Sequence, residues 1–510
     1  MRPSAYAIVV LVAAILAGVC CTVAFASPAE RFQRALDTWD LGAARRALEE
    51  ADAGGRKART STAWGYLAFL EGNYSRAEAL LSRRMDRDAR VLIQVVRETM
   101  RQTRDFATVN APSNRFEFRY ATGRDDVLIP YLAEAGDAAY GALVTRLGNA
   151  PATPIRVEIL PSIEALSAVT QLSVAVIQDT GTVALCKFNK VMMLSPAALP
   201  YGYPFADTLA HELVHFFAIR RAGEDVPVWF QEGLARYLEP IWRGGVAGAL
   251  SRGMQDLLAR AVTEKTLLYP TMLSGSLTPL DGIDAVASAF AQLSSLIGFI
   301  ERSHGPGTLP RLLDAMASGD PEDAVRRVTG RTLAQVVSAW SDDLSSTGIT
   351  AGSNAELVWQ GMRSLEPDKD ASLTADQRAA LRLADLLAAT GRHKAAVKQY
   401  QTLIEGWGRP APLVIERLAR ALLADGAAAE TLVVLDRAGL DEVEFASISR
   451  ARGLALVALG RTMDALGPLR IAVRTDPFDP EVHAALARIH SERGETALAE
   501  REQRLAGIGR

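Results

Sequence analysis

The chain has 510 residues, 49% hydrophobic and 23% charged, with a formal net charge of -3. This composition is that of a globular protein, and the length exceeds one ordinary core, so several domains are expected. The nearly balanced charge offers no basic surface for nucleic acid, and we expect no nucleic-acid partner.

Residues 1–26 have the pattern of an export segment. Arg2 precedes an uncharged apolar stretch at residues 5–26, which closes on small residues at Ala24 and Ala26. A basic start, an apolar stretch and a small-residue end are typical of a secretory signal peptide. The same stretch is long enough, at about 20 residues, to remain as a membrane anchor. Either alternative predicts an exported protein, periplasmic or secreted, and the second tethers it to the inner membrane through residues 5–26.

Residues 28–100 are predicted to be helical. Gly42 and Ala47, and then Gly72 and Ala77, stand five positions apart, which is the spacing of the close-packing residues in tetratricopeptide hairpins. The segment therefore resembles two tetratricopeptide-like hairpins. Ordinary helical hairpins without repeat ancestry remain the alternative.

Residues 110–346 are predicted to form an α+β domain with a small mixed sheet and a helical subdomain. Alternating or continuous apolar residues predict strands at 115–120, 155–160 and 190–195, and helical periodicity predicts helices at 127–147 and 163–170. From about residue 245 to 344 the pattern is helical throughout. The strand at 190–195 directly precedes the metal motif described next, so we expect it to hold an extended substrate at the edge of the sheet.

The segment HELVH places His211 and His215 four residues apart, on one face of a helix that is predicted to begin near Pro204 and to end near Gly223. Two imidazoles at this spacing can bind one zinc ion. Glu212 is offset from that face by one residue, which leaves it free to act on the attacking water. The sequence therefore predicts a zinc site with a catalytic carboxylate beside it.

Glu232 is the predicted third metal ligand. It lies 17 residues after His215, in the segment WFQEGLA. If one helix ends near Gly223 and a second begins near Pro227, an antiparallel return brings Glu232 level with His215, at about 1.5 Å per residue. Two histidines and one carboxylate leave one coordination position open, as catalytic zinc requires.

Residues 347–373 are predicted to be a linker, and residues 374–508 a repeat array. Glycines recur there at spacings of 35, 34 and 34 residues, at Gly391, Gly426, Gly460 and Gly494. This period is that of tetratricopeptide repeats, which the segment resembles. Stacked hairpins form concave surfaces for other polypeptides, so we expect a protein partner at the repeats.

The central motifs together resemble the gluzincins and, within them, the peptidase MA-like domains. The resemblance rests on HELVH at 211–215 and WFQEGLA at 229–235, and extends over about residues 110–346. It implies one zinc ion per chain, bound by His211, His215 and Glu232, with Glu212 as general base and acid. Phe290 departs from the family pattern, because these domains often place a tyrosine there. Three nearby tyrosines are weak candidates for an oxyanion donor and are better explained by packing: Tyr201, Tyr203 and Tyr237.

The sequence thus predicts an exported zinc metallopeptidase that hydrolyses peptide bonds in a polypeptide substrate. Two alternatives remain open. One is a catalytically inactive periplasmic scaffold in which the repeats bind a partner. The other is a zinc amidase that acts on cell-wall material, because the motif specifies water activation and leaves the acyl group undefined.

Overall fold

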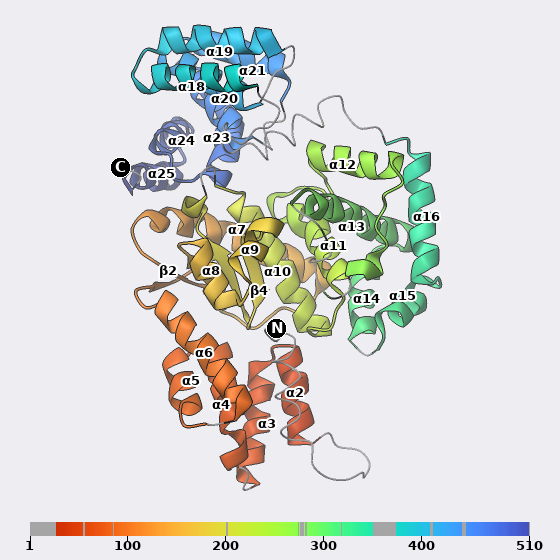
Figure 1. Cartoon of the computed structure of the whole chain (residues 1–510). Helices are drawn as coiled ribbons and strands as arrows, with labels where there is room; N and C mark the ends of the chain where they lie inside the picture. The colour runs from red at the N-terminus through yellow and green to blue at the C-terminus, as the bar shows by residue number, and fades with distance from the viewer. Residues whose placement is uncertain are drawn as a thin grey trace.

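The computed structural model describes most of the chain after the first 26 residues (Figure 1). The predicted signal or anchor lies outside the described residues, as does the predicted linker at 347–373 apart from residues 347–349. No helix in the described part is long and apolar enough to cross a membrane. The described ranges are 27–349 and 374–508, without residues 55–56, 85, 200–201, 274, 276–279, 281–282, 318, 408–411 and 441–444.

Five helices form the N-terminal flank, as the sequence predicted for residues 28–100. Side-chain caps begin four of them, because Ser27, Asp40, Asn73 and Asp86 each accept a hydrogen bond from a backbone N–H in the first turn. The helices are α2 (Pro28–Asp37), α3 (Leu41–Ala53), α4 (Lys57–Leu70), α5 (Tyr74–Leu81) and α6 (Arg87–Gln102).

A five-stranded mixed sheet follows, with strand order β1-β2-β3-β5-β4. Strand β2 pairs in parallel with β3, and β3 in parallel with β5, whereas β1 and β4 are antiparallel to their neighbours. The strands are β1 (Ala107–Asn110), β2 (Phe116–Tyr120), β3 (Ile155–Leu160), β4 (Ala184–Lys187) and β5 (Lys190–Leu194). The three predicted strands are present, and β1 and β4 add one strand at each edge.

The sequence predicted that strand β5 holds an extended substrate at the edge of the sheet. This prediction is wrong. It is paired on both sides, by β3 through Val157 and Val191 and by β4 through Cys186 and Val191. A fully paired strand has no free edge for another peptide. All five residues of β5 are buried, which explains the apolar run at 191–194, while the buried Lys190 pairs with Glu158.

Helices pack on the sheet and carry the chain to the metal motif. They are α7 (Leu128–Leu147), α8 (Ile163–Thr170), α9 (Val174–Thr180), α10 (Phe205–Ala222) and α11 (Val228–Leu238). Helix α10 packs against α7, α11 and strand β4. The predicted helices at 127–147 and 163–170 correspond to α7 and α8.

A helical subdomain packs against α11 and lies at the right of the central domain in Figure 1. It comprises α12 (Arg252–Thr263), α13 (Ile283–His304), α14 (Thr308–Met316), α15 (Pro321–Thr329) and α16 (Leu333–Ser346). The expectation of helix throughout residues 245–344 is wrong for 245–251, which precede α12, and for 264–269, which follow it. The first of these breaks separates α12 from the short 3-10 helix at Glu239–Arg243. Gly248 explains this break, since its φ of +75° lies in the left-handed region.

Eight helices form the described part of the C-terminal flank. They are α18 (Ala375–Ala389), α19 (His393–Trp407), α20 (Pro412–Ala424), α21 (Ala428–Ala438), α22 (Ala446–Ala458), α23 (Thr462–Thr475), α24 (Pro480–Glu492) and α25 (Thr496–Ile508). Each periodic glycine lies in the turn inside one helix pair with a positive φ, from +72° at Gly494 to +81° at Gly426. The glycine period thus marks consecutive helical hairpins, and their descent from tetratricopeptide repeats stays a prediction.

Both flanks pack against the central domain. One continuous apolar core includes Trp39 from the N-terminal flank, Phe216 from α10, and Phe478 and Leu505 from the last hairpin. Trp39 donates a hydrogen bond to Glu224 at 2.6 Å, and its ring lies 5.1 Å from that of Phe216. The N-terminal flank therefore stabilises the C-terminal end of α10 through the side chain of Trp39.

Candidate metal centre

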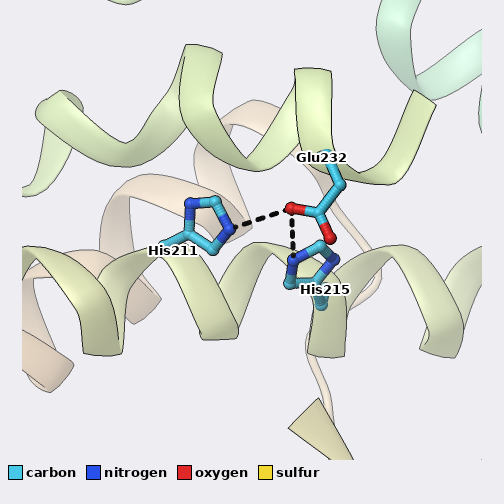
Figure 2. A group of neighbouring side chains, drawn as sticks. All are labelled: His211, His215 and Glu232. Carbon is cyan, nitrogen blue, oxygen red and sulfur yellow. Dashed lines mark hydrogen bonds and ion pairs between the residues drawn. The ribbon is translucent and has the colours of Figure 1, made fainter. Parts of the chain in front are cut away.

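The two histidines lie on α10, whose bounds match those predicted from Pro204 and Gly223. Gly223 ends this helix with a φ of +89°, a backbone conformation that favours glycine. Pro227 then opens α11, which packs along α10 and brings Glu232 toward the histidines. Figure 2 shows both imidazoles on one helix and the carboxylate reaching them from the neighbouring helix.

The three predicted ligands converge on one point. Their ligand atoms all lie within 4.8 Å of one another. Oε2 of Glu232 is 3.3 Å from Nε2 of His211 and 3.6 Å from Nε2 of His215. Ligand atoms at the corners of a zinc tetrahedron stand about 3.4 Å apart, given bonds of roughly 2.0–2.1 Å. The donor types and their separations therefore fit a zinc ion.

The charges of this cluster favour an ionised carboxylate beside the histidines. Burial acts to lower the pKa of His211, but its hydrogen bonds with Glu232 and Glu239 raise it to about 10. Burial acts to raise the pKa of Glu232, yet the charges of His215 and His211 hold it well below its usual range. The carboxylate is thus in the form that binds a metal, and metal binding must displace protons from the imidazoles.

Glu212 is buried on α10, next to the ligand residues. Burial raises the pKa of its carboxyl, while the positive charges of His215 and His211 act in the opposite direction. A hydrogen bond from the backbone N–H of Cys186 also lowers this pKa, which places Glu212 against strand β4. A carboxylate with a raised pKa is suited to take up a proton and release it again.

Glu239 belongs to this site and was missed by the sequence analysis. Its Oε2 lies 3.3 Å from Nδ1 of His211, on the opposite side of the ring from Glu232. Arg236 holds the carboxylate with contacts of 2.7 and 2.5 Å. Metal-binding histidines commonly donate their second ring N–H to such a carboxylate. The sequence offers one signal for Glu239. It lies seven residues after Glu232, which places it two helical turns farther along the same face.

Phe290 lies beside the metal-site histidines, whereas the hydroxyls of Tyr203 and Tyr237 are hydrogen-bonded to other residues. The Phe290 ring lies 6.1 Å from that of His211, so the departure from the family pattern is at the site itself. The Tyr203 hydroxyl donates to the carbonyl oxygen of Leu194, and the Tyr237 hydroxyl donates to Glu301 at 2.7 Å. Both tyrosines are buried packing residues with partners of their own. Tyr201 lies outside the described residues.

The comparison with protein families matches the Peptidase MA superfamily over residues 136–346. The match begins within α7, includes the cluster of His211, His215 and Glu232 on α10 and α11, and ends with the last residue of α16. The chain therefore carries a Peptidase MA superfamily domain, and this family indicates a peptidase. A search of curated proteins gave no matching relative.

Proposed function

We propose that this protein is a zinc metallopeptidase that hydrolyses peptide bonds, with His211, His215 and Glu232 as metal ligands. The observation that carries the proposal is the convergence of these three side chains beside a buried carboxylate, Glu212. The superfamily match supports it, since members of this superfamily are typically zinc metallopeptidases.

The chemistry needs a proton acceptor and an activated water. His211, His215 and Glu232 would hold a zinc ion, which would supply a Lewis acid for the scissile carbonyl and for the attacking water. Glu212 accepts the proton of the attacking water and delivers it to the nitrogen of the leaving amine. Burial raises the pKa of Glu212, which favours the protonated state that this second step requires.

Strand β4 is the better candidate for the strand that binds substrate. Among the described strands it pairs only with β5, so its outer edge is free, and it packs against α10. The Cys186 backbone contacts Glu212, which places this edge beside the proposed base. An extended peptide that adds to β4 would present its backbone to the metal centre, whereas a peptide has no free edge on β5.

Metal content is the first test. The protein from residue 27 to the end, purified without chelator, is expected to contain about one zinc ion per chain. Glu232→Ala should lose most of it, while Gln231→Ala should keep it, because Gln231 donates to the Val226 carbonyl and not to the site. A folded parent that binds no added zinc would overturn the proposal and favour a scaffold.

Activity is the second test, with an unfolded protein and peptidoglycan as parallel substrates. Glu212→Gln should retain zinc and lose cleavage of the unfolded protein by 10²-fold or more, the usual range for general acid–base catalysis. Unchanged cleavage in this variant would exclude Glu212 as the base. Cleavage of peptidoglycan alone would identify the amidase alternative.

We also propose that the enzyme is exported and that its C-terminal helical hairpins bind a protein partner or the substrate. Export rests on the basic start and apolar stretch of residues 1–26. N-terminal sequencing of the mature protein separates the two alternatives, because a cleaved signal yields a start near Ser27 and an anchor leaves Met1. Protein found only in the cytoplasmic fraction would refute export.

A further inference from the structure

A cavity of about 590 Å³, largely open to solvent, lies between the N-terminal helices and the central sheet. Its walls come from the turn before α5, the end of α6, and strands β1, β2 and β3, which meet at the lower left in Figure 1. None of its lining residues belongs to the metal centre. A cavity of this size is typical of sites for small molecules.

Three arginines line the cavity and keep donors available. Arg156 donates from Nε to Glu117 at 2.9 Å and from Nη2 to the Glu71 carbonyl at 2.7 Å, which leaves Nη1. Arg119 has one ion pair, from Nη1. Arg104 makes no hydrogen bond or ion pair with any residue that the structure describes. Guanidinium groups with spare N–H donors bind carboxylate and phosphate groups strongly, often through two parallel hydrogen bonds.

The carboxylates near these arginines are already paired. The fully buried Glu158 contacts both Lys190, at 2.6 Å, and Arg119, at 3.2 Å, so one anion serves two cations. The remaining pairs are Glu117 with Arg156 and Glu71 with Arg45. The cavity thus has an excess of positive charge, and its complement is an anion.

Two of the three arginines, Arg119 and Arg156, are held in place before any ligand arrives. The Arg119 guanidinium carbon lies 5.0 Å from the centre of the Tyr74 ring, and Tyr74 donates a hydrogen bond to the buried Glu158. Gly72 has a φ of +77°, and a Cβ there would lie 2.1 Å from the guanidinium carbon of Arg156. The chain therefore gives Arg156 room that any other residue would fill. Such preorganisation reduces the entropic cost of binding.

We propose that this cavity binds a small molecule through a carboxylate or phosphate group, held by Arg104, Arg119 and Arg156. The ligand bridges the N-terminal flank, which supplies Arg104, and the sheet, which supplies the other two arginines. Binding therefore stabilises the attachment of the flank to the central domain. This site is independent of the proposed peptidase activity.

Calorimetric titration of the protein from residue 27 onward with inorganic phosphate and with succinate, at fixed ionic strength, tests the proposal. At least one anion should bind and raise Tm. Arg104→Gln and Arg119→Gln should each weaken binding about tenfold, the usual effect of losing a charged hydrogen-bond donor. Arg90→Gln, an exposed arginine on α6 outside the cavity, should change nothing.

The two anions identify the ligand chemistry, since binding of phosphate alone indicates a phosphate ester and binding of succinate alone indicates a carboxylate. Repeating the titration in Glu232→Ala removes any contribution from the metal centre. Absence of binding by both anions overturns the proposal, as does binding that Arg104→Gln leaves unchanged. Arg104 is exposed, so this variant keeps the fold and decides the question even where Arg119→Gln does not fold.

Discussion

Removal of the Glu239 carboxylate should weaken zinc binding without removing a ligand. Glu239 faces Nδ1 of His211 at 3.3 Å, and its loss leaves the imidazole without the partner that orients it. Loss of such a partner costs roughly 10–100-fold in metal affinity. The 3.3 Å separation is long for a hydrogen bond. We therefore expect the loss of zinc affinity in Glu239→Ala to lie at the small end of this range, about tenfold or about 1.4 kcal/mol.

The assay is zinc competition against a chromophoric chelator at pH 7, which gives Kd for parent and variant. Glu301→Ala is the matched control, because Glu301 is a buried carboxylate paired with an arginine, Arg146, and does not contact a ligand residue. It carries the same cost of leaving an arginine unpaired. A Kd within twofold of the parent in Glu239→Ala, or an equal loss in Glu301→Ala, would refute the positioning role of Glu239.

Two further predictions concern the C-terminal flank. Gly202→Ala should lower the free energy of unfolding by about 1–3 kcal/mol, because Gly202 has a φ of +63° and an added Cβ would lie 2.1 Å from the Thr475 carbonyl oxygen. Urea denaturation measures the loss, and an equal loss in Gly141→Ala, where the structure leaves open space, would contradict this reason. Burial acts to raise the pKa of Glu502, but its hydrogen bond with His483 lowers it below the usual value. Such a group adds stability above the unfolded pKa of about 4.3 and loses it as pH falls through the folded pKa. Glu502→Gln should therefore be less stable than the parent near pH 7 and approach it near pH 3 in urea titrations, whereas a constant difference would exclude this linkage.

Much of the metal centre was predictable because its geometry is local. A helix fixes the relation of His211 to His215, and the short connection between Gly223 and Pro227 leaves one way for Glu232 to return. Pro204 and Gly223 likewise predict where α10 begins and ends.

What sequence reasoning missed depends on tertiary pairing. Strand β4 has only four residues and no strict alternation, so nothing in Ala184–Lys187 distinguishes it from a loop. Without β4, the sequence predicts that β5 lies at the edge of the sheet. Glu239 was missed because its partner His211 lies 28 residues earlier. The arginine-lined cavity was equally hidden, since its arginines come from the turn after α6 and from β2 and β3, and meet only in the folded chain.

The last hairpins are attached to the segment that leads into the metal-binding helix. The backbone N–H of Tyr203 donates to the Thr475 carbonyl at 3.2 Å, and Pro204 then opens α10. Helices α18 and α19 lie at the opposite end of the same array, away from the central domain (Figure 1). A displacement of the last hairpins would therefore act directly on the residues where the helix bearing His211 begins.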